Sequence, residues 1–448
     1  MNKPSDTQKA AKVPSSRVAR FSAFGGLATR LAGNIIKEGV KQYSQGQSPQ
    51  LKQLVMTPTN IGHIADKLAQ LRGAAMKVGQ MLSMDAGELL PPELTEVLAK
   101  LRSNANYMPH KQLIGVLKSH WGDNWLDALG QFELRPFAAA SIGQVHLAYL
   151  ATGEKLAVKI QYPGIKDSID SDIDNVASLL KMSGLVPNNV KLDELLSQAK
   201  QQLHHEADYL HEAALLIQYK QWVKHQAHFI VPKVYPALSN NSILCMEFVE
   251  GQSIESIASL DQHTRDSVAT RLLQLFLDEL FTFKLVQTDP NFGNFQYQAD
   301  TGCIVLLDFG ATRTISNSLS QGYKLLMQGA MTSDMALITE AASQIGFFQD
   351  NISAEQQALI VDIFHQACEP LRHNGEYDFA QSRLAKRVTD AARSMSTQQD
   401  EWHTPPMDAI FIHRKLAGIY LLAAKIKAKV NVQALFSVHQ TNDIEKSV

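Results

Sequence analysis

QTDPNFGNF at 287–295 and IVLLDFGATR at 304–313 form the most specific pattern in this chain. Asn294 follows Asp289 by five positions, and the apolar run 304–307 leads directly into Asp308 of a DFG triplet. Phosphoryl-transfer sites use this spacing: one Asp receives the proton of the acceptor hydroxyl, while an Asn and the DFG Asp hold Mg²⁺. Because Mg²⁺ prefers oxygen ligands, Asn294 and Asp308 are the predicted metal ligands and Asp289 the predicted catalytic carboxylate. The alternative is an ordinary loop, strand and turn with polar ends. Residues upstream that would complete a phosphoryl-transfer site decide between the two interpretations.

A lysine lies in the middle of a predicted strand upstream. The run LAVKI at 156–160 places Lys159 among apolar residues, which is costly unless its charge is paired. A strand lysine of this kind holds the α- and β-phosphates of ATP while paired with a helix glutamate. The helix predicted after it carries three carboxylates, Glu206, Asp208 and Glu212. Glu206 and Glu212 are six residues apart and do not lie on one line of the helix, which predicts different partners for them.

PFAAASIGQV at 136–145 is the hairpin expected to cover the phosphates. Such hairpins are usually rich in glycine, because bare backbone must approach the phosphates. Alanines take those places here and only Gly143 remains. We therefore expect a stiffer hairpin whose backbone approaches the phosphates differently. Residues 246–249 are the expected linker between two lobes, offering backbone groups to an adenine edge. The predicted nucleotide-binding residues are Ala138, Ala139, Ala140, Ser141, Val145, Lys159, Glu247 and Val249.

Length and composition bound the class of protein. The chain has 448 residues, enough for two or three lobes, and a formal net charge of −2, which argues against bulk electrostatic binding of nucleic acid. Three widely spaced cysteines match no metal-binding spacing and predict buried thiols in a reducing compartment. Charged residues interrupt every long apolar run, so we expect no membrane-spanning helix. The basic N-terminal residues lack the apolar core of a signal peptide, and we expect a solvated tail rather than a transit peptide.

The hydrophobic periodicity predicts helices over 60–82, from Pro91 to about Arg102, and over 110–120. Strands are predicted at 132–134, 142–149 and 155–161, with Thr152 and Gly153 in a turn, and again at 231–234 and 243–248. Helices are predicted over 165–184 and, as one long helix, from Asp193 to Val223, and the chain after Gly251 is mostly helical. A small strand-rich lobe followed by a larger helical lobe predicts an α+β, protein kinase-like two-lobe fold.

Two features differ from an ordinary protein kinase. Asn291 stands two residues after Asp289, where protein kinases usually place a lysine. No APE triplet follows the DFG, and Arg313 leads within a few residues into a predicted helix near Ser318. The platform that docks a peptide substrate is therefore expected to be missing.

Six motifs together resemble the UbiB-like (AarF-type) atypical kinases, most closely the branch with the mitochondrial coenzyme Q kinase-like ATPases. The resemblance covers about residues 13–435, although Gln287 and Asn291 replace histidines that many bacterial members carry. The motifs are KVGQ (77–80), PFAAASIGQVH (136–146), VKIQYPG (158–164), EADYLHEA (206–213), QTDPNFGN (287–294) and LLDFGATR (306–313).

The resemblance implies a role for each matching residue. Lys77 and Gln80 would belong to an N-terminal helical extension packed over the active site, where a peptide would otherwise bind. Glu206 and Asp208 would hold that extension through Lys77, and Glu212 would pair with Lys159. The alanines of the hairpin would tune nucleotide selectivity and restrain kinase activity. The implied domains are a basic tail with a candidate membrane-contact helix (1–50), the extension (51–125), the N-lobe (126–250) and the C-lobe (251–448).

The resemblance also implies an ATPase or kinase that uses ATP and Mg²⁺ and supports ubiquinone biosynthesis. Its partners would be ATP or ADP and a quinone-precursor-like lipid or quinone-biosynthesis proteins. The helix predicted within 21–46 suits contact with a membrane surface and ordinary packing equally well. We expect a cytoplasmic protein, peripheral on the inner membrane in a bacterium, or a protein of the mitochondrial matrix side in a eukaryote. The alternatives are a protein kinase and a non-catalytic lipid-binding scaffold.

Overall fold

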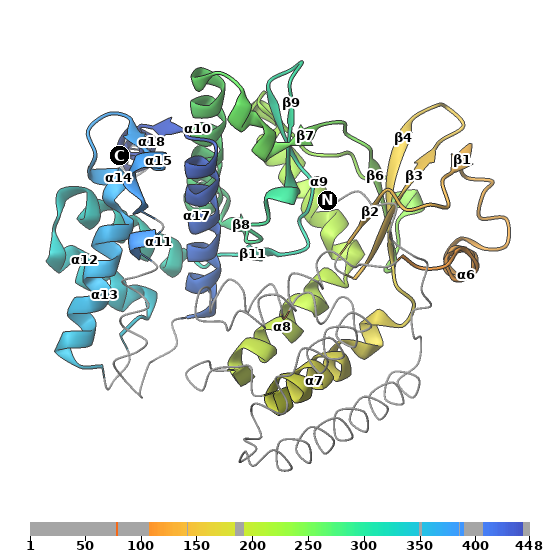
Figure 1. The fold of residues 1–448 in the computed structure, drawn as a ribbon, viewed down its shortest axis with the longest axis horizontal. Coiled ribbons are helices and arrows are strands. Elements are labelled where there is room, and N and C mark those ends of the chain that lie inside the picture. The colour runs from red at the N-terminus through yellow and green to blue at the C-terminus, as the bar shows by residue number, and fades with distance from the viewer. Residues whose placement is uncertain are drawn as a thin grey trace, which may run out of the picture. The chain divides into compact units, whose positions relative to one another are not determined.

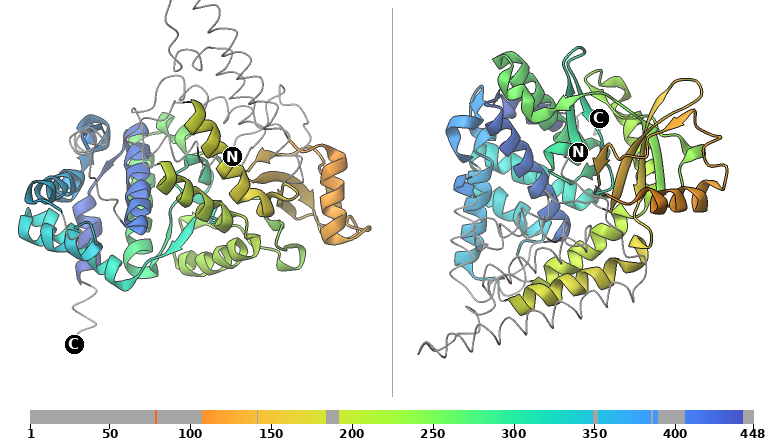
Figure 2. Two further views of the ribbon diagram at one scale, coloured as in Figure 1. Left: turned by 90° about the horizontal axis from the view of Figure 1, so that it is seen from below. Right: turned by 45° about the vertical axis from the view of Figure 1, so that its right-hand side comes forward.

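The computed structural model forms two compact units, which are described separately below (Figures 1 and 2). Unit 1 contains the chain up to Ile217 together with Lys233–Phe248, and unit 2 contains Gln218–Pro232 and Val249–Val448. The predicted tail, the residues Lys77 and Gln80, and the predicted helices over 60–82 and 91–102 lie outside the described residues, except for Val78, which is helical and buried. The described residues are 78, 107–140, 142–183, 192–348, 352–384, 386–388 and 406–441.

Unit 1 is built on an antiparallel sheet in the order β1-β3-β4-β6, with β2 paired to β3 (Figure 1). The strands predicted at 142–149 and 155–161 and their connecting turn are confirmed, and Gly153 suits that turn because its φ is +90°. Of the strand predicted at 132–134, only Phe132 lies in β1. Helix α6 precedes the sheet, as predicted. The bounds are α6 His110–Trp121, β1 Gln131–Phe132, β2 Ala138–Ala139, β3 Gly143–Tyr149, β4 Lys155–Gln161 and β6 Ile243–Glu247.

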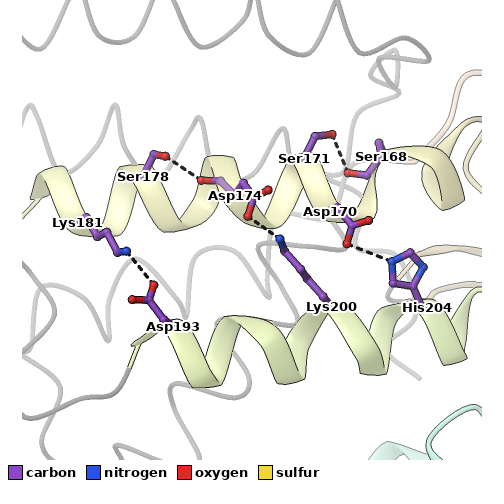
Figure 3. Close-up of polar contacts among 9 residues, drawn as sticks. All are labelled: Ser168, Asp170, Ser171, Asp174, Ser178, Lys181, Asp193, Lys200 and His204. Carbon is purple, nitrogen blue, oxygen red and sulfur yellow. Dashed lines mark hydrogen bonds and ion pairs between the residues drawn. The ribbon is translucent and has the colours of Figure 1, made fainter.

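Helices α7 (Ile165–Ser183) and α8 (Leu192–Glu206) form an antiparallel pair in the same unit, joined along one side by polar contacts (Figure 3). The contacts in Figure 3 include Lys181–Asp193 at 2.8 Å, Lys200–Asp174 at 2.6 Å and His204–Asp170 at 3.2 Å. These side chains are largely exposed, so each pair contributes little stability. Apolar residues of both helices are buried, among them Ile173 of α7 and Leu196 of α8.

The single long helix predicted from Asp193 to Val223 is wrong, because the chain breaks at Ala207–Asp208 into α8 and α9 (Tyr209–Trp222). Asp208 begins α9 as its N-cap, since its Oδ1 accepts a hydrogen bond from the N–H of His211 at 3.0 Å. The carbonyl of Ala207 accepts a hydrogen bond from Gln161 Nε2 at 2.9 Å, which satisfies an oxygen at the end of α8. Side chains thus replace the helical hydrogen bonds at this break.

Unit 2 contains several short strands around the DFG segment. A four-stranded sheet has the order β5-β10-β9-β7, and β8 pairs separately with β11. The strand predicted at 231–234 is wrong: β5 spans Phe229–Ile230, where it pairs in parallel with β10. The other bounds are β7 Gln252–Ser253, β8 Leu285–Gln287, β9 Phe295–Gln298, β10 Cys303–Leu306 and β11 Thr312–Thr314.

Among the described residues, the rest of unit 2 is mostly helical, as predicted (Figure 1). Helix α10 (Gln262–Asp278) runs into a π-helical turn at Glu279–Phe283 and packs beside α17 (Met407–Lys425). Helix α11 (Asn317–Thr332) begins at the N-cap Ser316. The remaining elements are α12 Met335–Ile345, α13 Ala354–Ala367, α14 Glu369–Arg372, α15 Phe379–Ser382, α18 Val432–Thr441 and the strand pair Tyr377–Asp378 with Lys429–Val430. Within the described ranges, no helix has both the length and the apolarity needed to cross a membrane.

Candidate nucleotide and metal site

The predicted catalytic loop of unit 2 is held by hydrogen bonds among its own polar residues. Asn294 Nδ2 donates to Asp289 Oδ2 at 2.9 Å, and the N–H of Asn291 donates to Asp289 Oδ1 at 3.2 Å. Asn291 Oδ1 in turn accepts from the N–H of Gly293 at 3.0 Å. Asn294 is buried, with 7% of its surface exposed. These contacts fix the Asp289 carboxylate and the Asn294 amide relative to each other.

The DFG segment is joined to this loop by further hydrogen bonds. The N–H of Leu307 donates to the carbonyl of Asn294 at 3.0 Å, which holds the end of β10 beside the loop. Thr288 donates through its hydroxyl to the carbonyl of Ala311 at 2.6 Å. Asp308 Oδ1 accepts a hydrogen bond from the N–H of Gly310 at 3.0 Å. Residues 287–313 therefore form one connected structure.

The oxygens of Asn294 and Asp308 fit Mg²⁺. Since Asn294 Nδ2 is engaged by Asp289, the amide oxygen is the atom that Asn294 can offer to a metal ion. Asn294 and Asp308 border one small cavity of about 10 Å³, roughly the space of a single water molecule. Among the described residues there is no group of three His, Cys, Asp or Glu placed to hold a metal. Two protein oxygens with nucleotide phosphates completing the shell are the usual way in which such sites hold Mg²⁺.

Unit 1 contains a buried ion pair between the strand lysine and the helix glutamate. Lys159 Nζ on β4 lies 2.7 Å from Glu212 Oε1 on α9, and the two side chains are 5% and 1% exposed. The ammonium group also lies 5.5 Å from the ring centre of Tyr209. Lys159 thus has the glutamate partner that a phosphate-holding lysine requires.

The comparisons with known proteins agree on one family. The ABC1 atypical kinase-like domain matches residues 100–342. The chain is 36% identical to "Atypical kinase COQ8, mitochondrial" of Saccharomyces cerevisiae over 433 residues, covering 96% of this chain and 86% of that protein. The chain belongs to the ABC1 atypical kinase-like family. This membership confirms the predicted kinase-like fold and the resemblance stated above.

Two further similarities agree with this family membership. A COQ8B atypical kinase, mitochondrial, of Rattus norvegicus is 35% identical, covering 96% of this chain and 82% of the relative. Among solved structures, the complex of Rv3197 with erythromycin from Mycobacterium tuberculosis aligns with a TM-score of 0.57 at 25% identity. That alignment covers 82% of this chain and 92% of the solved one.

The alanine-rich hairpin of this ABC1-family chain is closed by its own backbone. Ala138 and Ala139 pair with Val145 and Gln144, and the N–H of Ala140 donates to the carbonyl of Gly143 at 3.0 Å. A Cβ at Gly143 would lie 2.2 Å from the carbonyl oxygen of Ile160, so the glycine is required by the neighbouring strand β4. Packing against β4 is thus sufficient to explain Gly143. Ser141 lies outside the described residues, and the nucleotide contacts of the hairpin stay a prediction.

The linker residue Glu247 is tied to the chain before β6. Its N–H donates to the carbonyl of Lys233 at 2.8 Å, and its Oε2 accepts from the N–H of Lys233 at 3.0 Å. The N–H of Phe248 donates to the carbonyl of Lys155 at 2.9 Å. The adenine contacts assigned to Glu247 and Val249 stay predictions. Glu206 ends α8 and Asp208 begins α9, while their predicted partner Lys77 lies outside the described residues.

The structure adds a buried polar cluster, Tyr219–Glu279–Gln287–Lys415, behind the catalytic loop of this atypical kinase-like domain. Glu279 is fully buried and Lys415 is 3% exposed, with Lys415 Nζ 3.7 Å from Glu279 Oε2. Burial raises the pKa of Glu279, an effect that Lys415 opposes. Burial also lowers the pKa of Lys415, against the neighbouring carboxylates of Glu279 and Asp289. One signal in the sequence could have pointed to Glu279: it interrupts the apolar run 272–285.

Helix α17 packs directly on the catalytic loop and on the segment after the DFG. Gly418 is buried against Pro290, and a Cβ added there would lie 2.5 Å from the Cβ of the proline. Arg313 forms an ion pair with Asp408 at 2.9 Å, and its guanidinium lies 4.1 Å from the ring centre of Phe411. Helix α17 therefore contacts both halves of the 287–313 segment.

Proposed function

We propose that this chain is a Mg²⁺-ATP-dependent atypical kinase or ATPase that supports ubiquinone biosynthesis by acting on, or near, a lipid-like small molecule. The observation that carries the proposal is the geometry of residues 289–308. A carboxylate, an amide oxygen and the DFG carboxylate are held on one connected segment, with the amide nitrogen of Asn294 already engaged by Asp289. The similarity to mitochondrial COQ8 proteins supports the link to ubiquinone.

Each residue has a defined task in this proposal. Bound Mg²⁺-ATP supplies the phosphoryl group with its charge partly neutralised. Asn294 and Asp308 present the oxygens that hold the metal ion, and Asp289 accepts the proton of the attacking water or hydroxyl. Lys159, oriented by Glu212, holds the α- and β-phosphates. Catalysis of this type rests mainly on positioning and on electrostatic stabilisation.

Phosphate release by the purified protein, with and without anionic liposomes, tests this proposal. We expect hydrolysis of ATP that requires Mg²⁺, rises when liposomes are added and is abolished in Asp289→Asn. Hydrolysis that persists unchanged in Asp289→Asn would remove the role assigned to this carboxylate. Absence of Mg²⁺-dependent hydrolysis under both conditions would favour a non-catalytic lipid-binding scaffold, and transfer of phosphate to added proteins would favour a protein kinase.

Metabolite profiling of a deletion strain tests the biological part of the proposal. We expect less ubiquinone and an accumulated precursor, restored by the wild-type chain and not by Asp289→Asn. The lipid-like ligand and peripheral contact with a membrane are part of the proposal, and the accumulated precursor would identify the chemical step. An unchanged quinone pool would contradict this part while leaving the ATPase activity to be judged separately.

A further inference from the structure

Lys415 lies deep in unit 2 and is directed at the start of the catalytic loop. It belongs to α17, and its Nζ donates a hydrogen bond to Gln287 Oε1 at 2.8 Å. The ammonium group also lies 5.1 Å from the ring centre of Phe295. With 3% of Lys415 exposed, water contributes little to solvating its charge. Gln287, Glu279 and the aromatic face thus replace the water that an exposed lysine would have.

Glu279 holds the same glutamine by its main chain. Its Oε1 accepts hydrogen bonds from the N–H of Gln287 at 3.2 Å and from the hydroxyl of Tyr219 at 2.7 Å. Glu279 begins the π-helical turn that follows α10, a rare backbone form that is frequent at functional sites. Lys415 therefore binds the side chain of Gln287, and Glu279 binds its backbone N–H.

Gln287, held in this way, also contacts the predicted metal site. Its Nε2 donates to the carbonyl of Asp308 at 3.2 Å, and its backbone pairs with Thr312 across β8 and β11. Gln287 stands two residues before Asp289. Glu279, Gln287 and Lys415 also line the same small cavity as Asn294 and Asp308. Two hydrogen bonds therefore connect Lys415 of α17, through Gln287, with the backbone of Asp308, a predicted metal ligand.

We propose that Lys415 is a positioning residue of the phosphoryl-transfer site, which acts through Gln287 on Asp308. The inference rests on the proposed function. Lys415 reaches Gln287, at the start of the catalytic loop, from a distant helix, in a chain that has Asn291 where protein kinases place a lysine. Stability alone does not account for the pair, because well-packed apolar residues often replace a buried ion pair without loss.

The expected effect is on metal affinity. Residues that orient metal ligands from behind typically change metal affinity or activity by about 10- to 100-fold when they are replaced. We expect a loss of that size in the affinity of the nucleotide-bound protein for a divalent cation. We expect a similar loss in turnover, with little change in the affinity for nucleotide without metal.

The experiment compares four forms of the full chain by titrating Mn²⁺ in the presence of ADP and following free Mn²⁺ by electron paramagnetic resonance. Lys415→Met/Glu279→Gln removes both charges, so neither is left buried alone. Gln287→Leu keeps both charges and removes the bridge to Asp308. Lys425→Met is the matched control, since Lys425 lies on the same helix and pairs with Glu255 at the surface.

The wild type and Lys425→Met should bind Mn²⁺ alike, and the other two variants should bind it about 10- to 100-fold more weakly. The double variant should keep a thermal midpoint close to that of the wild type. Gln287→Leu should remain folded at the assay temperature with a lower midpoint, because it takes an acceptor from the buried Lys415. Wild-type affinity in either variant would overturn the proposal. If the double variant fails to fold, the Mn²⁺ affinity of Gln287→Leu alone tests the proposal. If the wild type binds Mn²⁺ and ADP but hydrolyses no ATP, the proposed function fails while the Mn²⁺ titration still judges Lys415.

Discussion

Gly418→Ala should damage catalysis far more than it damages the fold. The added Cβ would lie 2.5 Å from Pro290 Cβ and 3.3 Å from Pro290 Cα. Carbon atoms in ordinary contact stand about 3.5–4.0 Å apart, so α17 and Pro290 must separate by roughly 1 Å. Pro290 adjoins Asp289 and has a fixed φ, so the displacement is passed to the proposed catalytic carboxylate rather than absorbed by a side chain.

The free energies for this variant can be bounded. Overpacking costs about 1–3 kcal/mol, while replacing a helical glycine by alanine returns about 1 kcal/mol through helix propensity. The net loss is therefore about 0–2 kcal/mol, a fall of at most roughly 8 °C in the thermal midpoint. A displacement of 1 Å at reacting groups can lower turnover by about 100-fold.

The assay is the rate of phosphate release at saturating ATP, paired with thermal unfolding of the same samples. Gly115→Ala is the matched control, because it adds a Cβ to a glycine of α6 that has no heavy atom within 4 Å of that position. We expect the control to keep full turnover and to gain up to about 1 kcal/mol. Full turnover in a folded Gly418→Ala protein would refute the claim that α17 sets the position of the catalytic loop.

Three further predictions follow from the same structure. Lys159→Met removes the cation that lies beside the buried Glu212, and it should lower the free energy of unfolding by about 3–5 kcal/mol. Lys159→Met/Glu212→Gln should recover this stability but not turnover. Equal stability of the single and the double variant would contradict this prediction. Ala139→Gly should raise autophosphorylation, measured as incorporated labelled phosphate, because the hairpin gains freedom; no rise would count against the restraint assigned to the alanines. Burial lowers the pKa of His146 to about 4. The unfolded chain therefore binds a proton that the folded chain does not between about pH 6.5 and 4, and stability should fall by roughly 3 kcal/mol as the pH is lowered across that window. Thermal midpoints from pH 7.5 to 5 should fall less steeply in His146→Gln, and identical slopes would exclude this role of His146.

Local patterns were sufficient to predict most of the elements that form the candidate site. The strands around Lys159, the polar loop at 289–294 and the apolar strand before Asp308 each follow from a few neighbouring residues, and the structure contains all three. The break between α8 and α9 was missed because the helical period continues across it. It depends on the N-cap Asp208 and on Gln161, a residue 46 positions away from Ala207.

The cluster around Lys415 could not be found in that way. Its contact with Gln287 spans 128 positions, and a lysine within a helix usually lies on a solvated face. Nothing in the spacing of α17 shows that this face is buried against the catalytic loop. Glu279 was visible only as a charge within an apolar run, which does not name its partner. Long-range packing therefore determines this part of the candidate site.

The most direct test of the central claim is the Mg²⁺ dependence of nucleotide binding, measured by calorimetry on the wild type and on Asp308→Asn. If residues 287–313 form a site for Mg²⁺ and nucleotide, Mg²⁺ should tighten the binding of ADP to the wild type. The same addition should have little effect on Asp308→Asn, because an amide oxygen is a weaker ligand for Mg²⁺ than a carboxylate. Binding of ADP that is equally strong with and without Mg²⁺ in the wild type, or equally Mg²⁺-dependent in the variant, would contradict the account.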